Sequence, residues 1–220
     1  MPVLGRKANL REERRAATER QIAAATRELL DDGESFADLS IDMIAARAGI
    51  SRTAFYDYFR DKRELLIRLV GEAMEPIMRE ADELVGGRPS GPTEIPHTIA
   101  AAVAFARGSP QVFRAAVEAA GYDPVISSFW REQLLERFID VIEERIRKQR
   151  KAGIALPIHP RAAAVALVMM VVETLYHHVS SDEGLTDDQV LETLVTISVR
   201  AVYGPVDELA SGKKRAARRG

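Results

Sequence analysis

Apolar residues recur at helical spacing along nearly the whole chain, and the clearest case lies between residues 39 and 62. Four apolar residues there follow the spacing i, i+3, i+4, i+7, namely Ile41, Ile44, Ala45 and Ala48. This spacing predicts a short helix with one buried face. Gly49 permits a sharp turn after it, and Ser40 and Ser51 can cap the helices before and after that turn. The stretch therefore predicts two short helices with the layout of a helix-turn-helix.

The second helix of this pair is expected over Arg52 to Phe59, and it has an apolar half and a polar half. The apolar half consists of Ala54, Phe55, Tyr58 and Phe59. The polar half consists of Arg52, Thr53, Tyr56, Asp57 and Arg60. Arg52, Thr53 and Tyr56 supply the donors that reach phosphates and base edges when a helix lies in a major groove. The same spacing also occurs in helical hairpins of protein cores, so spacing alone leaves both interpretations open.

The rest of the pattern is helical as well, and no strand-like alternation is long enough to predict a sheet. Further helices are expected over residues 12–32, 62–85, 96–107, 110–120, 124–151, 160–179 and 186–203. Gly71 and Pro76 weaken or bend the helix over 62–85. The Gly- and Pro-rich stretch 86–96 predicts a loop. The chain is therefore expected to be all-α, with an N-terminal three-helix domain joined to a larger helical domain.

The domains are expected to follow in a simple order along the chain. A flexible basic arm is expected over 1–10, the helix-turn-helix domain over 11–66, a larger C-terminal domain over 67–206 and a disordered basic tail over 207–220. A basic arm can reach phosphates or a minor groove, although a disordered terminus is the simpler interpretation.

Composition changes this picture little. A hydrophobic content of 46% and a charged content of 29% are ordinary for a soluble globular protein. The absence of cysteine excludes disulfides and thiolate metal ligands, and it is consistent with a reducing cytoplasm. The N-terminal residues are too polar for a secretory signal, and the longest apolar run, 162–172, is much shorter than the roughly 20 residues that span a bilayer. We therefore expect a cytoplasmic protein without a membrane partner.

The net charge of −2 conceals an uneven distribution. Residues 1–27 contain seven cations and three anions, and residues 213–219 contain five cations and no anion. The remaining residues therefore carry −11. Basic ends on an acidic body match a protein that contacts DNA at one end, whereas solvated tails are the alternative, above all for the C-terminal segment.

The sequence IAARAGISRTAFYDYFRDKREL resembles the signature of the TetR family of bacterial transcriptional regulators, which reads roughly IA..AGVS.GTLY.YF.SKE.L. The matching residues are Ala45, Ala48, Gly49, Ile50, Ser51, Tyr56, Tyr58, Phe59, Lys62 and Leu65. The resemblance implies contacts to the DNA backbone from Ser40, Tyr58 and Lys62. Ala54 is a departure, because the family often has Thr at this position. The missing hydroxyl leaves Arg52 or Thr53 to replace that phosphate contact.

The larger side chains of the C-terminal domain could line a pocket for an apolar small molecule. Within the family, the helix with Trp130 and Phe138 and the ending LVTISVRAVYG resemble the ethionamide-type repressors, which implies a long, narrow, aromatic-lined channel. Ordinary core packing is the alternative, because an aromatic stripe at helical spacing is typical of a core. The expected pocket residues are Val103, Phe105, Phe113, Trp130, Leu134, Phe138, Val168, Val171 and Glu173. A solvated surface carboxylate is the alternative for Glu173.

The helix that starts at Pro160 is apolar nearly all round, so it must be covered on more than one side. Its outward face and the last helix predict a contact in a twofold dimer, as the resemblance also implies. Burial inside a monomer is the alternative. The expected interface residues are Met169, Val172, Tyr176, Leu191, Leu194, Ile197 and Val202.

The sequence gives little support to an enzyme. The four histidines are scattered, and no metal-ligand spacing, nucleophile elbow or phosphate loop is present. We therefore predict a ligand-responsive, homodimeric transcriptional regulator that binds a near-palindromic double-stranded DNA operator, without cofactor or metal. The resemblance favours a repressor that a small apolar effector releases. A helical enzyme or an interaction protein that does not bind DNA is the alternative from a different class.

Overall fold

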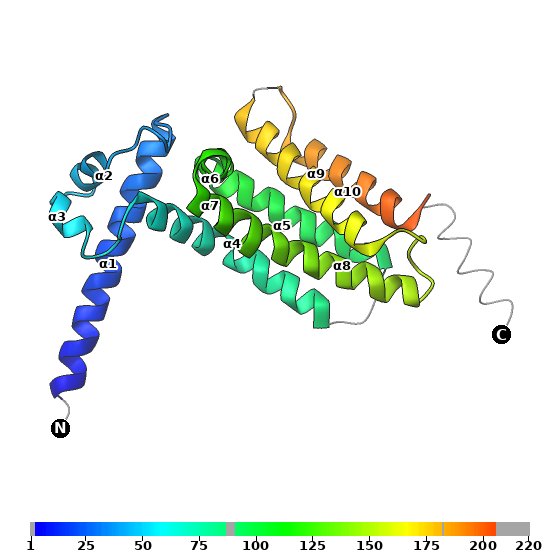
Figure 1. Cartoon of the computed structure of the whole chain (residues 1–220), viewed down its shortest axis with the longest axis horizontal. Helices are drawn as coiled ribbons and strands as arrows, with labels where there is room; N and C mark the ends of the chain where they lie inside the picture. Colours follow the sequence, from blue (N-terminus) through cyan, green and yellow to red (C-terminus); the bar gives the residue numbers. More distant parts are fainter. Residues whose placement is uncertain (1–2, 87–90, 182, 206–220) are drawn as a thin grey trace, which may run out of the picture. The chain divides into compact units, whose positions relative to one another are not determined.

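The computed structural model describes residues 3–86, 91–181 and 183–205 (Figure 1). Helices and no strands are present in these ranges, so the all-α prediction is confirmed. The predicted tail over 207–220 and residues 87–90 of the predicted loop lie outside the described residues.

The chain divides into two compact units, and the first comprises residues up to 72 together with 111–127. Its elements are α1 (Val3–Asp31), α2 (Ile41–Arg47), α3 (Arg52–Phe55), the start of α4 (Lys62–Gly86), nearly all of α6 (Pro110–Tyr122) and α7 (Pro124–Ser128). The largest fully buried side chains of this unit are Ile22, Leu30, Leu39, Ile44, Phe55, Phe59, Leu65, Leu66, Leu69 and Ile126. They form the core that positions α2 and α3.

Helix α1 is longer than the sequence predicts, because it already begins at Val3. Residues 3–10, expected as a flexible arm, continue this helix, since no proline interrupts the stretch from Val3 to Asp31. Gly33 ends the helix with φ 98°. Its N–H donates to the carbonyl of Leu30 at 3.1 Å and the N–H of Glu34 donates to that of Leu29 at 3.2 Å, which is the Schellman arrangement.

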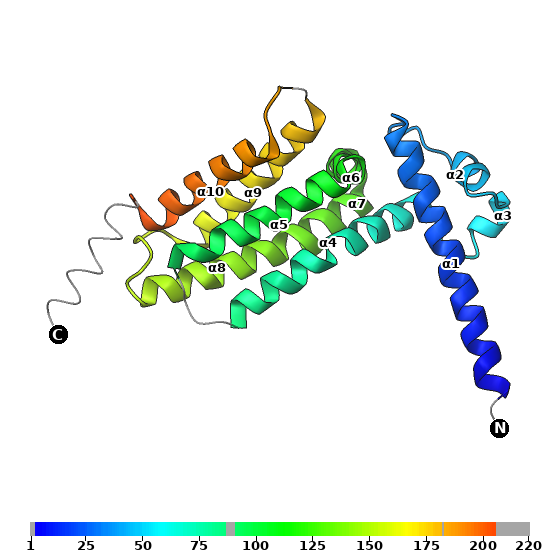
Figure 2. The same ribbon diagram turned by 180° about the vertical axis from the view of Figure 1, so that it is seen from behind.

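The second unit comprises residues 73–110 and the chain from 128 onward. Its elements are the rest of α4, the short 3₁₀ helix η1 (Gly91–Glu94), α5 (Ile95–Gly108), the π-helical segment η2 (Phe129–Leu135), α8 (Glu136–Lys151), α9 (Pro160–Ser180) and α10 (Asp187–Tyr203). Helix α9 lies beside α8, and α10 lies beside both α5 and α9, in both views (Figures 1 and 2).

The boundary between the two units falls inside α4, between Glu72 and Ala73. Gly71 lies just before this boundary and Pro76 lies inside the helix just after it. Pro76 has no N–H to donate to the carbonyl of Glu72, so one helical hydrogen bond is missing there. Helix α4 is therefore weakest where the two units join.

The helix expected over 124–151 is not continuous as an α-helix. Residues 129–135 form a π-helical segment between α7 and α8, and the N–H of Glu136 accordingly donates to the carbonyl of Arg131, five residues back. A π turn contains an extra residue, and such segments are rare and found mostly at functional sites. Apolar periodicity does not distinguish them from an α-helix, so the prediction of one regular helix is wrong at this point.

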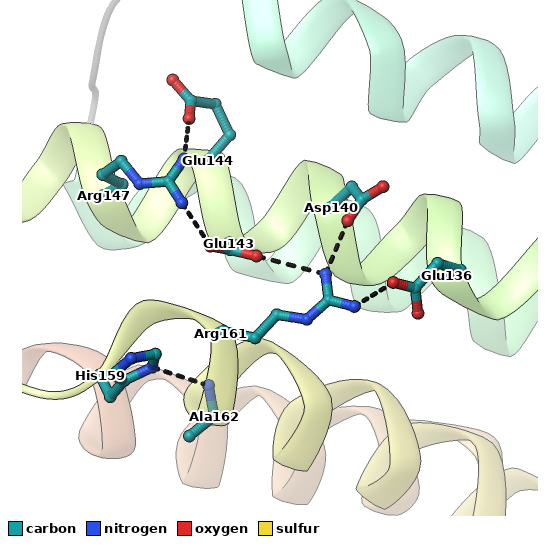
Figure 3. Close-up of polar contacts among 8 residues, drawn as sticks. All are labelled: Glu136, Asp140, Glu143, Glu144, Arg147, His159, Arg161 and Ala162. Atoms are coloured by element: carbon teal, nitrogen blue, oxygen red, sulfur yellow. Dashed lines mark hydrogen bonds and ion pairs between the residues drawn. The ribbon is translucent and has the colours of Figure 1, made fainter.

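Arg161, in the first turn of α9, fastens this helix to α8 (Figure 3). Its guanidinium pairs with Glu136, lies 2.6 Å from the carboxylate of Asp140 and 3.2 Å from that of Glu143. Hydrogen bonds to these carboxylates, above all to Glu136, raise the pKa of Arg161. One cation thereby offsets the repulsion of three carboxylates on α8.

Helix α9 is the one helix in the described ranges that is long and apolar enough to cross a membrane. Only 17% of the residues in its most apolar window are buried in the single chain. The core helix of a soluble protein meets the same criterion of length and composition, so one such helix is weak evidence for a membrane span. It does show that much of the apolar surface of α9 is not fully covered.

Candidate nucleic-acid interface

Two serine caps and one glycine set the geometry of the helix-turn-helix. Ser40 Oγ accepts a hydrogen bond from the N–H of Met43 at 3.2 Å, and Ser51 Oγ accepts one from the N–H of Ala54 at 3.0 Å. These are the N-caps of α2 and α3 that the sequence predicts. Gly49 adopts φ 67° between them, a conformation that other residues rarely tolerate.

Helix α3 is shorter than the predicted span of Arg52 to Phe59, because its regular part ends at Phe55. The next three N–H groups donate to carbonyls three residues back, which is the tighter 3₁₀ pattern. The predicted division into two halves is nevertheless confirmed. Phe55 and Phe59 are buried, Ala54 and Tyr58 are half-buried, and the polar residues Arg52, Thr53, Tyr56, Asp57 and Arg60 are exposed.

Arg52 and Tyr56 lie together on the exposed face of α3. The Arg52 guanidinium pairs with Asp42 of α2, and its Nη2 lies 3.4 Å from the Tyr56 hydroxyl. The same guanidinium lies 6.0 Å from the centre of the Tyr56 ring. The charge of Asp42 raises the pKa of Arg52, so the side chain stays cationic. The contacts of Arg52 with Asp42 and Tyr56 thus orient its guanidinium and the Tyr56 hydroxyl on the surface that the sequence predicts to bind DNA.

Lys62, for which the family resemblance implies a phosphate contact, makes hydrogen bonds within the domain. Its ammonium donates to three backbone carbonyls, those of Phe36 at 3.0 Å, Ala37 at 2.8 Å and Leu39 at 2.7 Å. Burial lowers the pKa of Lys62, while the three acceptors favour its charged form. All three protons are used within the domain, where they hold the segment that leads into α2.

Two residues of α1 support this site although the sequence pattern does not indicate them. Arg15 Nη1 donates to the carbonyl of Asp57 at 3.0 Å, and its guanidinium lies 5.4 Å from the centre of the Tyr58 ring. Gln21 Nε2 donates to the carbonyl of Ala48 at 2.6 Å, next to the glycine of the turn. The only sequence signal was the basic character of the first 27 residues, which does not specify these acceptors.

Comparison with known proteins supports this interpretation of the fold. Residues 22–69 match the family model described as "Bacterial regulatory proteins, tetR family", and residues 95–204 match "Transcriptional regulator EthR, C-terminal domain". The chain belongs to the TetR family. It is therefore a DNA-binding transcription regulator and not an enzyme.

Similar proteins agree with this assignment. The EthR regulator of Mycolicibacterium smegmatis is 29% identical over 187 residues, which cover 82% of this chain and 84% of that protein. The EthR regulator of Mycobacterium tuberculosis is 29% identical over 202 residues, or 87% and 90% of the two chains. The crystal structure of FadR from Bacillus subtilis in complex with stearoyl-CoA has a TM-score of 0.70 at 17% identity, covering 84% of this chain and 99% of that one.

The pocket residues predicted for this TetR-family regulator differ in their exposure. Val103, Trp130, Leu134 and Val168 are buried in the second unit, and Phe113 is buried in the first. Phe105, Phe138 and Val171 are half-buried, whereas Glu173 is exposed, as expected for a solvated carboxylate. A cavity of about 370 Å³ lies between α5 and α10 and shares only Val103 with the predicted set. Its other lining residues are Ala100, Ala104, Arg107, Gly108, Asp187, Asp188 and Leu191.

The predicted interface residues of the regulator also separate into two groups. Leu194 and Val202 are each 1% exposed, so they belong to the core of the single chain and not to a free surface. Met169, Val172, Tyr176 and Leu191 are half-buried, and Ile197 is 46% exposed. Within the described part of the chain, no group of three or more His, Asp or Glu side chains could hold a metal ion.

Proposed function

We propose that this regulator is a homodimeric repressor that binds a near-palindromic operator through α3 and leaves it when a small apolar effector binds. The observation that carries the proposal is the exposed surface formed by Arg52, Thr53 and Tyr56, which two capped helices fix in position. The proposed place of action is the cytoplasm, because the family and its relatives are bacterial transcription regulators.

Each side chain of this surface has a task that its chemistry allows. Arg52 can donate two hydrogen bonds to the major-groove edge of guanine, and Thr53 and Tyr56 can bind a phosphate or a base edge. Ser40 Oγ accepts from Met43 and keeps its own proton for a phosphate oxygen. Thr53 is exposed next to Ala54, so it is the hydroxyl best placed to replace the one that Ala54 lacks.

The dimer contact is proposed on α9 and α10. Val165 and Ile197 are 38% and 46% exposed, and Met169, Val172, Tyr176 and Leu191 are half-buried. Apolar side chains on this scale favour a second copy of the chain as their cover. Two copies would bring two α3 helices to successive turns of one face of the DNA.

The effector is proposed to bind beside Trp130 and Leu134. Both side chains are buried and both lie in the π-helical segment, a local irregularity of the kind that accompanies binding sites. The EthR-type C-terminal match covers this segment, and the FadR neighbour is described in complex with stearoyl-CoA. An effector releases DNA only to the extent that it binds more tightly to a conformation that does not fit the operator.

The single tryptophan of the chain makes this proposal testable. Stearoyl-CoA and an uncharged long-chain ester are the two probes, each titrated into the protein bound to a fluorescent operator duplex. We expect the anisotropy of the duplex to fall in parallel with a change in Trp130 emission. An emission change with no loss of DNA would separate ligand binding from regulation and contradict the repressor mechanism.

A further inference from the structure

The N-terminal unit contains two arginines whose guanidinium groups have no ion-pair or hydrogen-bond partner among the described residues. Arg11 and Arg14 of α1 are exposed, and neither side chain has an ion pair or hydrogen bond in the part of the chain that the structure describes. An exposed arginine is ordinarily unremarkable. Its significance here comes from comparison with the other cations of the same unit.

The cations of this unit from residue 21 onward all have an acidic or carbonyl partner among the described residues. Arg47, for example, lies 2.8 Å from the carboxylate of Asp32, and Arg68 lies 2.7 Å from that of Glu19. The others are Arg27, Arg52, Arg60, Lys62, Arg63 and Arg114. The uncommitted positive charge of the unit is therefore concentrated at the start of α1.

The basic residues at the start of α1 follow helical spacing. Arg11, Arg14 and Arg15 follow the spacing i, i+3, i+4, which places them on one side of α1. We call these three residues the α1 basic stripe. The carboxylates of this helical stretch, Glu12, Glu13 and Glu19, fall at about 100° or more from Arg14 around the axis, by the helical angle of about 100° per residue.

Arg15 connects the α1 basic stripe to the exposed surface formed by Arg52, Thr53 and Tyr56, which is proposed to bind DNA. Its guanidinium lies 3.0 Å from Glu19, donates to the carbonyl of Asp57 and lies over the ring of Tyr58, directly after α3. The stripe therefore starts beside the recognition element and continues toward the N-terminus. From Arg15 to Arg11 it extends about 6 Å at 1.5 Å per residue, a length that covers about two base pairs.

We infer that the α1 basic stripe binds the phosphate backbone of the DNA that flanks each half-site. The inference rests on the proposed function, because it assumes that α3 occupies a major groove. Phosphates are the fitting ligand because Arg11 and Arg14 offer guanidinium groups that have no acidic or aromatic partner among the described residues. Arg11 and Arg14 add affinity and not sequence preference, because phosphates are the same at every base pair.

The test compares the wild-type protein with the double variant Arg11→Gln/Arg14→Gln on a selected operator, over a range of salt concentrations. Arg20→Gln is the matched control, because Arg20 is an exposed arginine of the same helix on a different side and donates to the carbonyl of Ala16. Each lost phosphate contact lowers the salt slope by about 0.9. The double variant in a dimer should therefore lower the slope by roughly 3 to 4.

We expect the double variant to retain the wild-type preference for operator over scrambled DNA while its salt slope falls. Wild-type protein should also lose affinity when the flanks of the duplex are trimmed, and the double variant should not. A salt slope equal to that of Arg20→Gln would overturn the inference and leave the proposed function intact. Wild-type protein without any preference for the operator would instead overturn the proposed function, and this inference with it.

Discussion

At the scale of single residues, Arg52 and Lys62 are two cations of one domain with different tasks. The Arg52 guanidinium is exposed beside Tyr56, whereas the Lys62 ammonium donates to three carbonyls between α1 and α2. Replacing Arg52 removes a group that faces solvent. Replacing Lys62 leaves carbonyl oxygens without their donor, and unpaired acceptors in a partly buried site cost stability.

We therefore expect Arg52→Ala to weaken operator binding roughly tenfold without changing the free energy of unfolding. Lys62→Met should lower the free energy of unfolding by about 1–3 kcal/mol. Urea denaturation followed by circular dichroism measures the second effect, and anisotropy with the operator measures the first. Arg60→Ala is the control for the loss of an exposed arginine. A Lys62→Met protein of wild-type stability with a reduced salt slope would restore the phosphate contact implied by the family.

The contrast between these two residues shows what the sequence could predict. The exposure of Arg52, Thr53 and Tyr56 follows from a spacing of 100° per residue, which is local information. The acceptors of Lys62 lie 23 to 26 residues earlier in the chain, and local periodicity does not indicate such a contact. The pairing of Arg15 with the carbonyl of Asp57, 42 residues apart, is missed for the same reason.

At the scale of elements, two glycines in the first unit have opposite roles. Gly49 has φ 67° in the turn before α3, whereas Gly71 lies inside α4 with open space at the position of a Cβ atom. Gly49→Ala should destabilise the protein by about 1–2 kcal/mol, because a Cβ atom disfavours the left-handed conformation. Gly71→Ala should stabilise it by about 0.4–1 kcal/mol, because alanine restricts the unfolded chain and suits a helix. Thermal unfolding of the two variants in parallel checks both signs, and effects of equal sign would contradict this account of the turn.

The contact between α8 and the end of α10 gives the fold a predicted alkaline limit. The Tyr203 hydroxyl donates to Gln149, and burial raises the pKa of Tyr203 to about 12. An unfolded tyrosine has a pKa near 10, so between about pH 10 and 12 the unfolded state loses its proton first. Stability from this group is complete below about pH 10 and falls as the pH rises toward 12.

Tyr203→Phe should accordingly flatten the loss of stability between about pH 10 and 12. Urea midpoints measured at several pH values in this window provide the test, with Tyr56→Phe as a control at an exposed tyrosine. Equal slopes for Tyr203→Phe and wild type would show that the phenol at the end of α10 does not control the alkaline transition.

Elements were predictable where periodicity and caps agreed, and less so elsewhere. The starts of α2 and α3 follow from Ser40 and Ser51, and α9 begins at Pro160 as predicted. The π-helical segment and the early end of α3 depend on hydrogen-bond register, which the apolar pattern does not encode.

At the scale of the whole molecule, recognition of a near-palindromic operator requires two copies of the surface formed by Arg52, Thr53 and Tyr56. One short helix reads few base pairs, and a twofold dimer combines two such helices on one operator. The incompletely covered apolar surface of α9, together with exposed Ile197 of α10, supplies the contact proposed for that dimer. The dimer contact proposed on α9 and α10 therefore determines the spacing between the two half-sites that the two α3 helices bind.

Selection of duplexes from a random pool by the purified protein, followed by sequencing, shows whether two α3 helices bind one operator. We expect an enriched near-palindrome whose two half-sites have centres about 34 Å apart, or a multiple of that distance. The Arg52→Ala protein should enrich it weakly or lose preference at particular base pairs. Enrichment of a single asymmetric site, or of no sequence at all, would show that the protein does not bind DNA as a twofold dimer through α3.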